Sequence, residues 1–202
     1  MQNTLFIISF LCSFVFFLSS AVAKTDAQVK QESYAVQGAT LCELKKEIHK
    51  KGVAGDDGKI WAGYSRWNIA WNFKATAKNK TDCSMEGVHT QADITITLPE
   101  WVPPKGTDPA VIAEWHRYVN ILKKHERTHA GYATRTAKKI DAELAGIKHF
   151  PDCQAVTELA DEKGQHLMES LRIKDREFDL KTNHGRTQGA VLKAECTQRV
   201  KD

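Results

Sequence analysis

The longest regular pattern in the sequence is a stripe at helical spacing between residues 112 and 144. Its members are Ile112, Trp115, Val119, Leu122, His125, His129, Ala133, Ala137, Ile140 and Leu144. Steps of three and four residues place them all on one face of a helix. Asp108-Pro109 is a helix start signal, and Gly146 supplies an end signal. A helix this long needs a second surface that covers its apolar face, and two histidines lie within that face.

Period-two alternation predicts the strands of a sheet before this helix. The inward positions are Trp67, Ile69, Trp71, Phe73 and Ala75 in one strand and Ala92, Ile94, Ile96 and Leu98 in the next. Polar residues occupy most of the positions between them, so one face of the sheet is expected to be buried.

Helical spacing and capping residues predict two further helices. Thr40 and Glu43 have the spacing of a capping box, which predicts a short helix ending at Gly52. Asp152 is expected to cap a second long helix after the histidine-bearing one. Residues 24–32 are expected to be a loose polar leader, and residues 178–189 a structured loop. The expected fold class is α+β, with a small antiparallel or mixed sheet followed by two long helices.

The composition is that of a globular protein and gives no sign of a nucleic-acid-binding one. Of the 202 residues, 42% are hydrophobic and 27% are charged. This balance is typical of a globular chain. The net charge is +4, and basic residues are interleaved with acidic ones, so no nucleic-acid partner is expected. We expect one domain spanning residues 24–202, of undetermined oligomeric state.

The N-terminal segment predicts export. Residues 1–23 contain no charged side chain, and an apolar run from Leu5 to Leu18 precedes Ala21-Val22-Ala23. This order is typical of a secretory signal peptide with a small-x-small cleavage pattern. An uncleaved membrane anchor is the alternative, but about 14 residues are few for spanning a bilayer. The mature protein is therefore expected in the periplasm or outside the cell, without stable membrane association.

The cysteines agree with export. Five are present, and removal of Cys12 with the signal peptide leaves Cys42, Cys83, Cys153 and Cys196. They contain no C-x-x-C pair, so a tetrathiolate metal site is not expected. An even number in an exported chain predicts two disulfides, for which three pairings are open.

The five residues His125-Glu126-Arg127-Thr128-His129 match the pattern H-E-x-x-H. Residues i and i+4 lie one above the other on a helix, so both imidazoles can reach one zinc ion. The carboxylate of Glu126 would lie near the ion without binding it, as a general base toward water. Solvated or hydrogen-bonded core histidines are the alternative explanation.

A catalytic zinc ion needs a third protein ligand. Tyr132 and Arg135 stand where the metzincin pattern has glycine and histidine, so the ligand is expected elsewhere. His184 is the first choice, because Gly185 beside it permits a close backbone approach. Further candidates are Glu158, Glu162, Asp179, His166 and His149. Asp179 is also considered as a residue that orients a ligand histidine.

The order of these features resembles a bacterial family of predicted secreted zinc-dependent proteases, a domain of unknown function in the HExxH zincin superfamily. The matching segments are Trp71-Asn72-Phe73, Cys83, Leu98-Pro99-Glu100-Trp101, Trp115 before the metal motif, Phe178-Asp179-x-x-Thr182-x-His184-Gly185 and Gln188-Gly189. The resemblance implies a zincin-like fold and peptidase activity, and it brings no known substrate.

We therefore expect an exported zinc metallopeptidase with one Zn²⁺ per chain, held by His125, His129 and His184. Glu126 would be the catalytic base, and the partner would be a peptide or protein substrate. The strand Ala92–Leu98 is expected to pair with the substrate as an edge strand. One rival is a non-catalytic exported binding module with structural zinc or none. A second rival is a hydrolase of cell-wall peptide cross-links.

Overall fold

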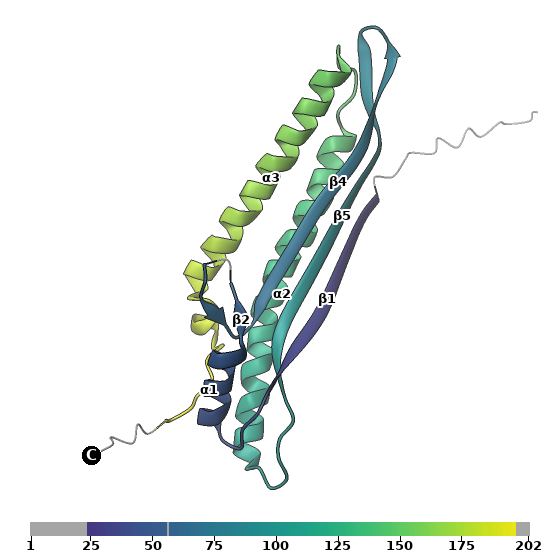
Figure 1. The fold of residues 1–202 in the computed structure, drawn as a ribbon. Coiled ribbons are helices and arrows are strands. Elements are labelled where there is room, and N and C mark those ends of the chain that lie inside the picture. Colours follow the sequence, from purple (N-terminus) through teal and green to yellow (C-terminus); the bar gives the residue numbers. More distant parts are fainter. Residues whose placement is uncertain (1–23, 56, 197–202) are drawn as a thin grey trace, which may run out of the picture.

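The structure, a computed structural model, describes residues 24–55 and 57–196 (Figure 1). The predicted signal peptide lies outside the described residues. In chain order the elements are β1 (Lys24–Val36), α1 (Leu41–Lys51), β2 (Val53–Ala54), β3 (Ile60–Trp61), β4 (Tyr64–Asn79), β5 (Asp82–Trp101), α2 (Pro109–Ala145), α3 (Cys153–Thr182) and the 3-10 turn η1 (Arg186–Gln188).

A mixed three-stranded sheet has the order β1–β5–β4. β4 pairs antiparallel with β5, whereas β1 runs parallel to β5, from Lys24 opposite His89 to Val36 opposite Trp101. The predicted inward residues of β5 are buried, and those of β4 are buried or half-buried. The predicted alternation is confirmed, because one face of these two strands packs into the core.

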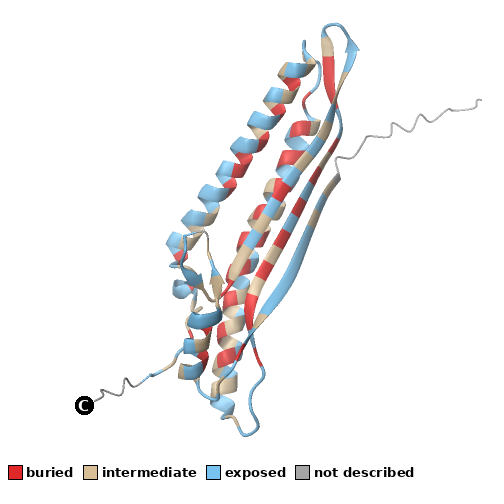
Figure 2. Ribbon diagram, in the orientation of Figure 1, coloured by how far each residue is buried: buried red, intermediate tan, exposed pale blue. Residues whose placement is uncertain are grey.

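Helix α2 lies along this buried face of the sheet, and α3 runs antiparallel to it beside β4 (Figure 1). Asp108 caps α2 by accepting a hydrogen bond from the backbone N–H of Ala110 at 2.8 Å. The apolar stripe faces the core from Trp115 to Leu144, as the buried bands in Figure 2 show. The predicted combination of a small mixed sheet and two long helices is confirmed.

Two disulfides connect elements that are far apart in the sequence. Cys83–Cys153 joins the start of β5 to the start of α3, beside backbone hydrogen bonds between Cys83 and Phe150. Cys42–Cys196 joins α1 to the segment that follows η1. The structure thereby selects one of the three possible pairings, and the disulfides fit an exported protein. Among the described residues, no helix is both apolar enough and long enough to cross a bilayer.

Three sequence expectations were wrong. Residues 24–32 belong to β1, because backbone pairing with β5 forms a polar edge strand that no alternation reveals. The segment Ala92–Leu98 cannot accept a substrate strand at its edge, because β5 is central and paired on both sides. Helix α3 extends to Thr182, so the loop expected from residue 178 begins only after that residue.

Helix α3 packs against the sheet through a contact that requires glycine. A Cβ atom at Gly164 would lie 2.4 Å from Cζ2 of Trp71. Replacing Gly164 by Ala should destabilise the fold by about 1–2 kcal/mol, since overpacking outweighs the gain in helix propensity. Urea unfolding measures this change. The double variant Gly164→Ala/Trp71→Phe should recover part of the loss, and an unchanged midpoint in the single variant would contradict the contact.

Candidate metal centre

Helices α2 and α3 bring three ligand atoms together. His125 and His129 are one turn apart on α2, both buried, with their Nε2 atoms 3.3 Å apart. Oδ1 of Asp179, on α3, lies 3.0 Å from each Nε2 atom. No second group of three His, Cys, Asp or Glu residues among the described residues converges as closely. The three atoms form a nearly equilateral triangle that could hold a metal ion.

The opposite nitrogen of each imidazole is held by an oxygen acceptor. Nδ1 of His125 is 2.9 Å from Oε1 of Gln188, and Nδ1 of His129 is 2.9 Å from Oδ1 of Asp175. These contacts place the proton of each neutral ring on Nδ1, so each Nε2 presents its lone pair to the centre of the triangle. Trp67 on β4 donates in turn to Asp175 at 2.8 Å. Metal-binding histidines are held in this manner.

Three electron-rich atoms this close require a positive charge among them. Without a metal, protons supply it. Burial alone would lower the pKa of His129, but its hydrogen bonds to Asp175 and Asp179 outweigh burial and raise it to about 10. For Asp179, burial favours a higher pKa, yet hydrogen bonds from His125 and His129 bring it well below its usual range.

The size of the triangle suits zinc. In a tetrahedral zinc site, ligand bonds of about 2.0–2.1 Å separate the ligand atoms by about 3.3 Å. The observed distances between Oδ1 of Asp179 and the two Nε2 atoms are both 3.0 Å, and the Nε2 atoms are 3.3 Å apart. Small outward shifts of Asp179 would therefore admit the ion.

Glu126 lies beside the triangle in a buried position on α2. Burial raises the pKa of its carboxyl group, and the neighbouring His125 and His129 oppose that rise. The chain between β3 and β4 passes close to α2 at this point. A Cβ atom at Gly63 would lie only 3.1 Å from Cγ of Glu126. Ser65 secures this close approach by donating its hydroxyl to the carbonyl of Glu126 at 2.8 Å.

A cavity of about 1000 Å³ opens onto the triangle and onto Glu126. Its walls come from α1, the hairpin of β2 and β3, the start of β4, α2, α3 and the chain after η1. Residues Tyr64 to Trp67 of β4 line it, and β4 is an edge strand of the sheet. The cavity therefore joins the triangle to the start of an edge strand.

His184 lies at this cavity but outside the convergent triangle. Its Nδ1 is 3.6 Å from Oδ2 of Asp179, the oxygen turned away from the two histidines. Its ring stacks on Trp61 with centroids 3.9 Å apart. The sequence favoured His184 as the third ligand and Asp179 as a residue that orients a ligand. In the structure the carboxylate of Asp179 faces the histidine pair, and His184 lies behind Asp179.

Gly185 makes the expected close approach, and its partner is His125. A Cβ atom at Gly185 would lie 3.2 Å from Cγ of His125, and the φ of this residue is +77°. Both features favour glycine. This turn also positions Gln188, which accepts from His125 and was not a predicted site residue.

The sequence signal for Asp179 was its spacing along α3. Leu167 and Leu171 are buried on the face that packs toward α2, and Asp175 and Asp179 follow at intervals of four residues. The same stripe therefore changes from apolar to acidic where it reaches the histidines. The remaining candidates for the third ligand lie outside the triangle; they are Glu158, Glu162, His166 and His149.

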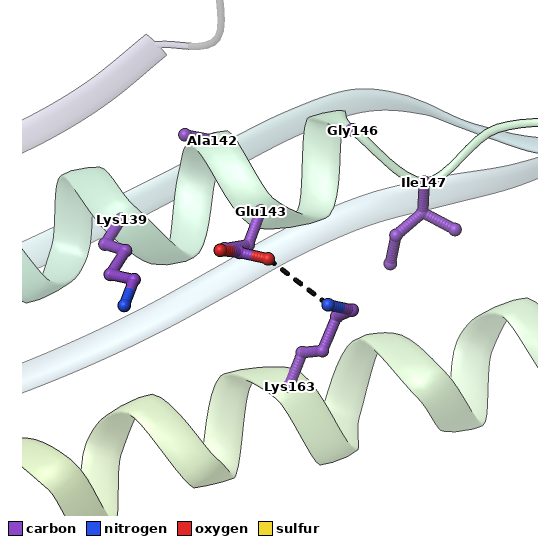
Figure 3. A pocket seen from close by; sticks show the side chains of 6 residues that line it. All are labelled: Lys139, Ala142, Glu143, Gly146, Ile147 and Lys163. Carbon is purple, nitrogen blue, oxygen red and sulfur yellow. Dashed lines mark hydrogen bonds and ion pairs between the residues drawn. The ribbon is translucent and has the colours of Figure 1, made fainter.

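A smaller hollow of about 400 Å³ lies between α2 and α3, away from the metal motif (Figure 3). Its lining residues are Lys139, Ala142, Glu143, Gly146, Ile147 and Lys163. Lys163 and Glu143 form an ion pair of 3.2 Å across it. None of the predicted site residues reaches this hollow.

Comparison with known families gives one match. The model of DUF922, described as a bacterial protein of unknown function, matches residues 31–185. The matched segment includes all three residues of the triangle and Glu126. It is consistent with the family resemblance seen in the sequence, and its description assigns no activity. No curated protein and no solved structure matches the chain.

The triangle predicts which substitutions remove the metal. Asp179→Ala should abolish stoichiometric zinc binding, because it deletes one of three converging ligand atoms. His184→Ala should weaken binding by about 10–100-fold, as expected of a residue that supports a ligand from outside. Competition with a chromophoric chelator measures both affinities. Tight binding by Asp179→Ala together with complete loss in His184→Ala would contradict this arrangement.

Proposed function

We propose that the chain, which belongs to the DUF922 family of bacterial proteins, is an exported zinc-dependent peptidase of the zincin type. The observation that supports this most strongly is the convergence of two imidazoles and a carboxylate at a large cavity, with Glu126 beside them.

The donor set fits one Zn²⁺ ion. Two imidazole nitrogens and one carboxylate oxygen are ligands that zinc accepts, and His125, His129 and Asp179 would supply them. Structural zinc sites are closed by four protein ligands, whereas three protein ligands and an open position are typical of catalytic sites. When bound, the ion supplies Lewis acidity to a water molecule and to a substrate carbonyl.

Glu126 is the group that moves protons. Its carboxylate lies next to the ligand pair and lines the cavity. Burial raises its pKa, which brings its basicity closer to the range in which a general base operates. It would accept a proton from the attacking water and transfer it to the leaving amine, so the peptide bond breaks with protons balanced.

The start of β4 is the surface on which a peptide would align. β4 is the edge strand next to the cavity, and its residues Ser65 and Trp67 touch Glu126 and Asp175. A substrate paired with this edge would lie across the triangle. This assignment replaces the one to Ala92–Leu98, because β5 has no free edge.

A binding module with structural zinc is the competing function. The hydrogen bonds that orient both histidines suit either role, but a module of this kind has no use for a buried carboxylate beside the ion and an open cavity in front of it. Hydrolysis of a cell-wall peptide would need the same residues, so it differs only in substrate.

Substitution of Glu126 by Gln separates these functions. The variant should keep one zinc ion per chain and lose peptide hydrolysis by at least about 10³-fold, since the proton acceptor is removed while the ligands stay. Hydrolysis of a quenched fluorescent peptide library and metal analysis of the same sample provide the measurement. Equal hydrolysis by Glu126→Gln and wild type would exclude this role for Glu126.

A further inference from the structure

The charged side chains of the large cavity are separated by sign. The acids near the triangle, Glu126, Asp175 and Asp179, are buried or half-buried, and Asp175 and Asp179 are bonded to the histidine pair. The exposed charged residues are mainly basic: Lys45, Arg66, Arg172, Arg176 and Arg186 against one acid, Asp57. The exposed rim of the cavity is therefore mainly positive, whereas three of its four acids lie deeper, beside the histidines.

Two of these arginines are aligned with a ligand of the triangle. Arg172, Arg176 and Asp179 occupy positions i, i+4 and i+7 of α3, which lie on one side of the helix. At a rise of about 1.5 Å per residue, Arg176 and Arg172 precede Asp179 by about 4.5 and 10.5 Å along the axis. An extended peptide advances about 3.3 Å per residue, so these offsets correspond to about one to three peptide residues.

Neither arginine is held by a strong ion pair. Both approach one carboxylate, Glu169, at 3.4 and 3.5 Å, and all three side chains are about half exposed. Exposed pairs at such distances contribute little to stability, so a competing carboxylate can replace Glu169. Lys45 and Arg186 form no ion pair with any described residue, which leaves their charge to act on the cavity that they line.

We propose that Arg172 and Arg176 bind a carboxylate of the substrate one to three residues from the scissile bond, which makes acidic peptides the preferred substrates. A guanidinium group matches a carboxylate with two parallel hydrogen bonds, and basic side chains around a cavity raise the local concentration of anionic ligands. This inference rests on the proposed peptidase function. The carboxylate can belong to an aspartate or glutamate side chain or to the C-terminus of the peptide.

Binding to the inactive Glu126→Gln chain, loaded with zinc, tests the inference without hydrolysis. The probes are fluorescein-labelled peptides that differ only by Glu against Gln, each with an amidated C-terminus, and a neutral peptide with a free or an amidated C-terminus. Fluorescence anisotropy should give at least about tenfold tighter binding for one carboxylate-bearing member of these pairs. Preference within the first pair identifies a side-chain carboxylate, and preference within the second a C-terminal one.

The double substitution Arg172→Gln/Arg176→Gln in the same background should reduce this preference to about twofold or less. Lys174→Gln/Lys181→Gln is the matched control, because both lysines lie on α3 outside the cavity lining and their loss removes the same charge from the same helix. Equal zinc content and thermal midpoint show that the variants are folded. Equal binding within both pairs, or a preference that survives the double substitution, overturns the inference.

Hydrolysis by wild type separates this inference from the proposed function. Cleavage at equal rates within both peptide pairs overturns the carboxylate preference and leaves the peptidase intact. Arginine-dependent binding without any cleavage overturns the peptidase and leaves the carboxylate site.

Discussion

The site depends on one electrostatic constraint: three acceptor atoms, from His125, His129 and Asp179, lie very close together between α2 and α3. Two Nε2 lone pairs and a carboxylate oxygen face one another at distances of 3.0 to 3.3 Å in a mostly buried place. Such an arrangement is stable only with a cation among its members, because burial makes uncompensated like charges and facing lone pairs costly. Protons meet this need in the metal-free chain, as the raised pKa of His129 indicates. A divalent ion held by His125, His129 and Asp179 would meet the same need in place of the protons.

The fold places these atoms by long-range contacts. β4 fixes Asp175 through Trp67 and fixes the backbone at Glu126 through Ser65. The chain after α3 returns to α2, where Arg117 donates to the carbonyls of Gly189 and Val191. That return secures Gln188 against His125. The disulfide Cys42–Cys196 then ties the same segment to α1.

The sequence predicted the elements whose two faces differ in polarity. Period-two alternation located β4 and the centre of β5, and the stripe and its caps located α2 from Asp108 to Gly146. Residues 24–32 of β1 escaped prediction, because most of them are exposed on both faces and only backbone pairing defines that part of the strand. A search for one periodic buried face cannot find such a strand.

The candidate site could be predicted in part for a related reason. His125 and His129 lie within one turn of one helix, so local spacing is sufficient to pair them. Asp179 is 50 residues further along the chain from His129, and only the antiparallel packing of α3 on α2 brings it to the pair. Sequence favours His184 because Gly185 follows it in a segment that resembles a loop. The left-handed turn at Asn183 and His184 sends the ring to Trp61 instead.

Anomalous diffraction at the zinc absorption edge, from crystals of the zinc-loaded protein, tests this account most directly. We predict one anomalous peak within bonding distance of Nε2 of His125, Nε2 of His129 and a carboxylate oxygen of Asp179, facing the cavity beside Glu126. A peak bound by His184 without Asp179, or no peak between α2 and α3, would contradict it.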